Sequence, residues 1–155
     1  MLEYFKKNNL VDYPVDVPKD WEEAIAISCQ KLIEQEYVSV NYVDDIIQSI
    51  IEFGPYIVII PNVAMPHAQG SRTSVLKSGV SFTKFSEPIM FIDEKENEKK
   101  PATLFFTLAA KNPDEHLENI SNLMGLFSDE EVMAALATSE TIEDFERIAN
   151  KGEEK

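Results

Sequence analysis

The chain contains two histidines, and the first lies in a segment that suits a reactive side chain. His67 follows an apolar run, within residues 61–70 (PNVAMPHAQG). Two prolines and a glycine stiffen this segment and keep it out of regular strand pairing. Pro66 favours an extended conformation in the residue before it, which sets the direction from which the imidazole projects. Because reactive side chains often lie on stiff segments after strands, His67 is the first candidate site residue.

The second histidine, His116, lies near a predicted helix start. Asn112 is a suitable N-cap and Pro113 a suitable first helical residue, so His116 should fall at the end of the first turn. His116 shares a helical face with Ile120 and Leu123, which places the ring at the rim of the core. Free backbone N–H groups at such a helix start would favour a nearby anion.

Phosphoryl transfer through an imidazole is the chemistry that fits these residues. Metal binding needs three or four ligands, and neither histidine has companions at ligand spacing, so we expect no metal and no cofactor. The G-x-S-x-G motif of many serine hydrolases is absent. A neutral imidazole, with an ordinary pKa of about 6.5, is a good nucleophile at neutral pH, and its phosphorylated form can pass the group onward. The spacing alone leaves open that one or both histidines are structural.

Two amphipathic helices should precede His67. The first is predicted for residues 21–36 after the N-cap Asp20, and the second for residues 41–53, ended by Gly54 and Pro55. The second has an apolar stripe that consists of Val43, Ile46, Ile47 and Ile50. Residues 56–60 form a short, β-branched apolar run, which predicts a buried strand.

Strands and then helices should follow His67. Residues 80–85, 89–92 and 103–109 are predicted strands, and the last is apolar on both faces, as a central strand would be. The charged stretch 93–100 should be an exposed loop between two strands. Helices are predicted for residues 113–127, 129–138 and 142–149, with capping boxes at Ser128/Glu131 and, more weakly, at Thr141/Asp144. This order predicts an α/β fold: a single-domain sandwich in which helices pack on the faces of a mixed sheet.

Length and composition fit one domain spanning residues 1–155. No apolar run approaches the roughly 20 residues of a membrane helix, and the N-terminus does not resemble a secretory signal, so we expect no membrane insertion and a cytoplasmic protein. The single cysteine, Cys29, excludes a disulfide within the chain, and a small buried thiol is expected there.

The charge of the chain restricts its partners. It has 14 basic and 28 acidic residues, a net charge of −14. This balance argues against nucleic acid, because binding to phosphates needs Lys and Arg. An acidic surface suits a basic protein partner, although simple solubility also explains the charge.

Residues 54–68 (GPYIVIIPNVAMPHA) resemble the active-site segment of phosphotransferase-system IIA components of the mannitol/fructose superfamily, the EIIA type-2 family. The GPY lead-in and the AMPH core are most similar to the ascorbate-like branch. The similarity extends to WEEAI at residues 21–25, SEPI at 86–89, and the stretch from Pro113 through His116 to LFSD at 126–129. It therefore covers about residues 18–150.

The resemblance implies a role for each histidine. In that family the histidine of the A-x-P-H segment accepts a phosphoryl group from the phosphocarrier protein HPr and donates it to a cysteine of the IIB component. His67 matches this residue, and His116 matches a second histidine that contacts the phosphoryl group and steadies the transfer state. Family members are α/β sandwiches whose HPr-facing surface combines apolar and acidic residues.

The sequence departs from the family pattern at the groups that help to bind phosphate. Ascorbate-like members often carry an arginine two residues after the active histidine, where this chain has Gln69, with Arg72 further on. Mannitol-like members carry an arginine well before the histidine, where residues 50–52 are Ile, Ile and Glu. Gln69 and Arg72 are thus the candidate phosphate contacts. The sugar is not predicted, because the membrane IIC component selects it.

Three functions follow as hypotheses. The first is a phosphocarrier in bacterial sugar uptake. The second is a regulatory IIA protein that controls a partner through its phosphorylation state, with the same chemistry at His67. The third is a structural domain in which both histidines are satisfied at the rim of the core.

Overall fold

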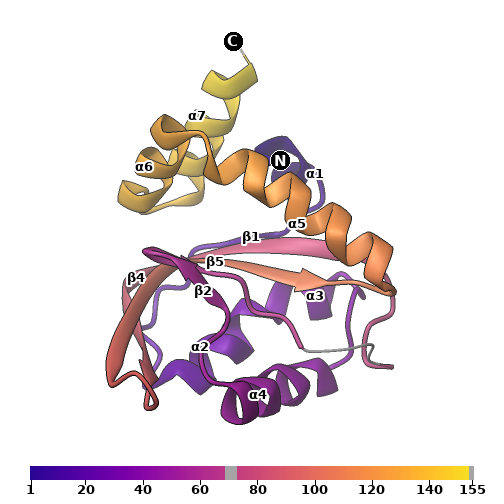
Figure 1. Ribbon diagram of the computed structural model, residues 1–155. Helices are drawn as coiled ribbons and strands as arrows, with labels where there is room; N and C mark the ends of the chain where they lie inside the picture. The colour runs from indigo at the N-terminus through magenta and orange to yellow at the C-terminus, as the bar shows by residue number, and fades with distance from the viewer. Residues whose placement is uncertain (69–72, 154–155) are drawn as a thin grey trace.

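The computed structural model describes residues 1–68 and 73–153. Helices lie on both faces of a central sheet (Figure 1). On one face lie α2 (Trp21–Ser28), α3 (Gln30–Glu34) and α4 (Asn41–Phe53). On the other lie α1 (Leu2–Lys7), α5 (Pro113–Phe127), α6 (Glu130–Thr138) and α7 (Ile142–Glu153). The predicted α/β sandwich is confirmed.

The described residues form a five-stranded mixed sheet with the order β1-β4-β5-β3-β2. Its strands are β1 (Val11–Asp12), β2 (Val58–Ile60), β3 (Asn62–Ala64), β4 (Gly79–Asp93) and β5 (Glu98–Ala109). The long β4 and β5 pair antiparallel, β1 is parallel to β4, and β3 is parallel to β5. β5 is central, as its apolar residues on both faces predict.

Aromatic side chains fill the core on each face of the sheet. Phe106 packs against Phe5, Phe82 and Phe127, and Phe82 also stacks on Phe145 of α7. On the opposite face, Phe105 contacts Phe85 and Phe91, and Phe91 in turn contacts Trp21 of α2. Full burial of such a ring contributes about 1.5–3 kcal/mol to folding. Phe105 and Phe106 are adjacent in β5 but lie on opposite faces of the sheet. Together they therefore pack both helical layers against one strand.

The predicted first helix is divided into α2 and α3 at Cys29. The Ser28 hydroxyl donates to the Ile25 carbonyl at 2.8 Å, and the Cys29 amide divides its bond between the carbonyls of Ile25 and Ala26. A side chain that competes for a backbone carbonyl weakens the regular helical pattern. Cys29 itself is buried as predicted, and burial raises the pKa of its thiol to about 12.

The bounds of α4 and α5 match the prediction because local signals determine them. α4 ends at Gly54, whose φ of 82° lies in the region that glycine adopts without strain. α5 begins after Asn112, whose side chain accepts the Glu115 amide at 2.9 Å. The described helices include none long and apolar enough to cross a bilayer.

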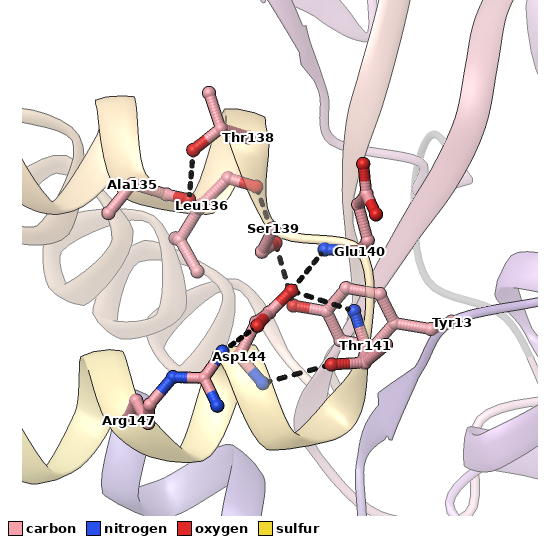
Figure 2. Close-up of polar contacts among 9 residues, drawn as sticks. All are labelled: Tyr13, Ala135, Leu136, Thr138, Ser139, Glu140, Thr141, Asp144 and Arg147. Atoms are coloured by element: carbon pink, nitrogen blue, oxygen red, sulfur yellow. Dashed lines mark hydrogen bonds and ion pairs between the residues drawn. The ribbon is translucent and has the colours of Figure 1, made fainter.

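The capping box predicted at Ser128/Glu131 is wrong. Asp129 caps α6 by accepting the Val132 amide at 3.1 Å, while the Ser128 hydroxyl donates back to the Gly125 carbonyl in the last turn of α5. The weaker box at the start of α7 is present (Figure 2). The Asp144 amide donates to the Thr141 hydroxyl at 3.1 Å, and the Thr141 amide donates to the Asp144 carboxylate at 3.2 Å.

Around the sheet, the structure differs from prediction at four places. The apolar run 56–60 yields an edge strand, β2, with Ile59 and Ile60 partly exposed, rather than a buried strand. Residues 80–85 and 89–92 belong to one long strand, β4, with an irregularity between Lys84 and Ile89. The N-terminal elements α1 and β1 were not predicted. The charged loop is shorter than expected, because strand pairing continues to Asp93 and Glu98.

Candidate functional site

The segment that carries His67 leaves β3 and runs along the end of β5. The Met65 amide donates to the Ile57 carbonyl at 2.8 Å, and the Leu108 amide donates to the Pro66 carbonyl at 2.9 Å. Met65 and Pro66 are buried, and His67 is half-buried. Pro66 has no N–H to satisfy, and its carbonyl connects this irregular segment directly to β5.

A bond to its own backbone fixes the tautomer of the His67 ring. Nδ1 lies 2.7 Å from the carbonyl oxygen of Met65. A carbonyl can only accept, so Nδ1 carries the hydrogen and the neutral ring keeps its lone pair on Nε2. Burial lowers the pKa of His67, against the opposing effect of the Met65 hydrogen bond, and the nearby His116 lowers it further. The imidazole is therefore neutral at pH 7, with Nε2 as its nucleophilic atom.

His116 lies beside His67. The centroids of the two rings are 5.2 Å apart and their planes are inclined by 47°. His116 is half-buried in the first turn of α5, and burial lowers its pKa as well. The Asn119 side chain, on the same helix, donates to the Ala109 carbonyl at 3.2 Å and so ties α5 to the end of β5. The two histidines, far apart in sequence, thus share one site.

The start of α5 offers less to an anion than the sequence suggested. The Glu115 amide is bound by the Asn112 side chain, the His116 amide by the Asn112 carbonyl at 3.1 Å, and Pro113 has no N–H. Asp114 and Glu115 also bring negative charge to this turn. The amides of Glu115 and His116 are therefore not free as expected, and the ring of His116 offers a further donor at this helix start.

Two tyrosines that the sequence analysis missed contact the segment around His67. The hydroxyl of Tyr56 donates to the His67 carbonyl, and the rings of Tyr56 and His67 meet edge to face at 5.1 Å. The hydroxyl of Tyr42 in α4 donates to the Leu108 carbonyl at 2.6 Å and accepts the Ala68 amide at 3.4 Å. Tyr42 lies four residues before Ile46 on the buried face of α4. A buried tyrosine hydroxyl needs a hydrogen-bond partner, so the place of Tyr42 on this face was the sequence signal for such a contact.

The remaining predicted contacts, Gln69 and Arg72, lie outside the described residues. Among the residues that are described, no group of three or more His, Cys, Asp or Glu side chains could hold a metal ion. The site therefore consists of His67 and His116, with Tyr42 and Tyr56 holding the backbone beside them. Its chemistry is that of a neutral imidazole nucleophile with a second imidazole in contact.

Comparison with known proteins agrees with this fold. Residues 4–152 match the family model "Phosphoenolpyruvate-dependent sugar phosphotransferase system, EIIA 2". The mannitol-specific cryptic phosphotransferase enzyme IIA component of Escherichia coli is 33% identical over 152 residues, covering 98% of this chain and 99% of the relative. A solution structure of the E. coli mannitol-specific cryptic enzyme IIA has a TM-score of 0.77 at 32% identity, covering 94% of this chain and 95% of the other.

Two further matches extend the comparison. The ascorbate-specific EIIA component of Mycoplasma pneumoniae is 35% identical over 119 residues, which cover 76% of this chain and 72% of the relative. The IIA protein in the complex of E. coli enzyme IIA and phosphorylated enzyme IIB for mannitol has a TM-score of 0.71 at 25% identity, with coverage of 90% and 92%. The chain belongs to the EIIA type-2 family of the sugar phosphotransferase system. It is a phosphocarrier component of that system.

Proposed function

We propose that His67 accepts a phosphoryl group on Nε2 from the phosphorylated carrier HPr and donates it to a cysteine of a IIB component, in the cytoplasm. The observation that carries this proposal is the bond between His67 Nδ1 and the Met65 carbonyl, which leaves the lone pair on Nε2. A new N–P bond forms at Nε2 as the P–N bond of phospho-HPr breaks. In the second transfer, a thiolate attacks phosphorus, an S–P bond forms and the Nε2–P bond breaks.

The lowered pKa of His67 supports this role. A protonated imidazole has no lone pair at Nε2 and cannot attack, so burial, which favours the neutral ring, keeps the nucleophile available. Burial lowers the pKa of His116 too, and a neutral imidazole still has one N–H. We propose that His116 donates this N–H to a phosphoryl oxygen, where negative charge is concentrated during transfer. Gln69 and Arg72 are proposed as further donors from their places in the sequence alone.

The surface beside the site suits a protein partner. Leu117 follows His116 in α5 and is 64% exposed, and acidic residues surround it at Asp114 and Glu118. An exposed apolar residue within an acidic surface favours a partner with an apolar centre and a basic rim. The solved complex of mannitol IIA with its phosphorylated IIB supports the same kind of partner for this chain.

The experiment is a phosphorylation assay with enzyme I, HPr and labelled phosphoenolpyruvate. The wild-type protein should gain one acid-labile, base-stable phosphoryl group, and His67→Ala should gain none. His67→Gln is a second variant that keeps a polar side chain of similar size. If either variant is labelled as well as the wild type, His67 is not the acceptor.

A regulatory role would use the same acceptor, so the onward transfer must separate the two functions. The labelled protein is mixed with a panel of IIB components. Loss of label to one IIB cysteine supports transport. Retention of label against every IIB, together with capture of a partner by one phosphorylation state alone, supports the regulatory alternative.

A further inference from the structure

We infer that Tyr42 and Tyr56 are positioning residues: their hydroxyls hold the two polar groups of the peptide between His67 and Ala68, so that Nε2 of His67 points in one direction. The expected effect on the transfer rate rests on the proposed function, whereas the expected effect on the His67 tautomer does not. Tyr56 belongs to the GPY lead-in of the segment that resembles the family, and Tyr42 lies outside that segment. Each hydroxyl bonds backbone groups rather than the imidazole itself. Their effect would pass through the backbone.

Tyr56 acts on the residue that carries the imidazole. Its hydroxyl donates to the His67 carbonyl, and its ring meets the imidazole edge to face, with the planes inclined by 80°. The carbonyl bond fixes the peptide plane after His67, and the ring contact restricts the imidazole itself. One side chain therefore restrains both the backbone and the ring of the same residue.

Tyr42 acts on the next residue and on the neighbouring strand. Its hydroxyl accepts the Ala68 amide and donates to the Leu108 carbonyl, while the Leu108 amide donates to the Pro66 carbonyl. The segment is thus bound to β5 on both sides of His67, before it through Pro66 and after it through the Tyr42 hydroxyl. Tyr42 is 3% exposed, and burial raises its pKa well above the ordinary value, so its hydroxyl keeps the hydrogen that it donates.

The bond that sets the tautomer depends on this backbone. His67 Nδ1 reaches a carbonyl only two residues earlier, and such a short loop closes only when the intervening peptide planes keep their orientation. The tyrosines hold the peptide that follows His67, so their loss frees the Cα of His67 to move relative to these planes. The ring can then release Met65, and the hydrogen can reside on either nitrogen. A nucleophile displaced by about 1 Å can lose about 100-fold in rate.

The test compares Tyr42→Phe, Tyr56→Phe and the double variant with the wild type. The readout is the ¹⁵N NMR signal of the His67 imidazole at one pH above neutrality. The wild type should show a single tautomer with the hydrogen on Nδ1, and the variants should show averaging towards the other tautomer. In the transfer assay each single variant should lose about fivefold in kcat, because one hydrogen bond is worth about 1 kcal/mol, with KM for HPr changed less than about twofold.

A matched control exists at the junction of α6 and α7. The Tyr13 hydroxyl bonds the Ser139 hydroxyl at 2.9 Å (Figure 2). The ring of Tyr13 packs against Phe82 in the core. Tyr13→Phe removes a comparable hydroxyl bond without touching the His67 segment. It should lower Tm by an amount similar to the other two and leave the His67 tautomer and kcat unchanged.

Two outcomes would overturn the inference. One is a single Nδ1–H tautomer with wild-type kcat in the double variant. The other is a loss of kcat in Tyr13→Phe equal to that in Tyr42→Phe and Tyr56→Phe, which would trace the effect to general stability. If a variant fails to fold, the same comparison is made with Tyr56→Trp, which keeps a ring edge and a donor. The tautomer readout needs no phosphoryl donor, so it holds even if the wild type takes no phosphate from HPr.

Discussion

The rings of His67 and His116 lie 5.2 Å apart although they belong to a strand exit and a helix start on different elements. Three connections bring them together: the pairing of β3 with β5, the bond from Leu108 to Pro66, and the bond from Asn119 to Ala109. β5 is common to all three. The central strand is thus the element that determines the distance between the two imidazoles.

Replacement of His116 should slow transfer without abolishing it. His116→Ala removes the N–H that we propose as a donor to the phosphoryl group, and loss of a single preorganised donor costs about 100-fold or more in rate. His116→Gln, which keeps an N–H, should recover part of that loss. Rapid-quench measurement of label transfer from phospho-HPr checks both. Equal rates for His116→Ala and the wild type would remove His116 from the mechanism.

Stability should fall as the pH drops below the ordinary histidine range. Burial lowers the pKa of His67 and of His116, so between the folded and unfolded values the unfolded chain binds more protons. The stabilisation is fully present above about pH 6.5, the unfolded value, and is lost as the pH falls through the lowered folded value. Urea unfolding midpoints measured from about pH 7.5 to 5.5 should decline in the wild type.

The double variant His67→Gln, His116→Gln is the control for this pH dependence. It lacks both titrating rings, so its urea midpoints should decline less over the same range. Carboxylates titrate mainly below that range and should affect both proteins alike. An identical slope in the two proteins would contradict the lowered pKa values.

Loss of the cap of α5 should impair both stability and transfer. Asn112→Ala removes the acceptor for the Glu115 amide and should cost about 1 kcal/mol in the free energy of unfolding. Because His116 lies in the turn that this cap holds, transfer should slow as well. Asp129→Ala removes the equivalent cap of α6 and should cost a similar amount of stability with no change in transfer rate. Urea unfolding and the labelling rate separate the two effects.

Two glycines should respond in opposite directions to alanine. A Cβ at Gly79 would lie 2.5 Å from the ring of Tyr37, so Gly79→Ala must displace a buried side chain and should cost about 1–3 kcal/mol. Gly125 lies inside α5 with nothing within 4 Å of its Cβ position, so Gly125→Ala should stabilise the protein by about 0.5–1 kcal/mol. Thermal unfolding of both variants checks the sign. A stabilised Gly79→Ala would show that the Tyr37 ring relaxes easily.

Helices were predicted well where their signals are local. The bounds of α4 and α5 follow from an apolar stripe, Gly54 at one end, and Asn112 with Pro113 at the other. The break at Cys29 was missed because it depends on the rotamer of Ser28, which bonds the Ile25 carbonyl. At the α5–α6 junction the predicted cap was wrong, because Ser128 still has helical backbone angles and bonds the Gly125 carbonyl, whereas Asp129 is extended and caps α6.

Strand positions were predicted less well, because apolar composition does not show whether a strand lies at the edge or in the interior of a sheet. Residues 56–60 have the β-branched character of a buried strand, yet β2 ends the sheet and pairs with β3 alone. The proximity of the histidines also depends on pairing between distant strands. The hydroxyl of Tyr42 was within reach of sequence reasoning, since a tyrosine on the buried face of a helix requires a polar partner.

The bond between His67 Nδ1 and Met65 bears on how easily a phosphoryl group could depart again. A ring that keeps its hydrogen on Nδ1 leaves phosphorus as neutral imidazole, whereas a ring without it would have to leave as a far more basic anion. A carbonyl that secures this hydrogen makes the departing nitrogen a good leaving group. The phosphorylated protein would then stay reactive towards a thiolate, so that one backbone oxygen serves both loading and discharge.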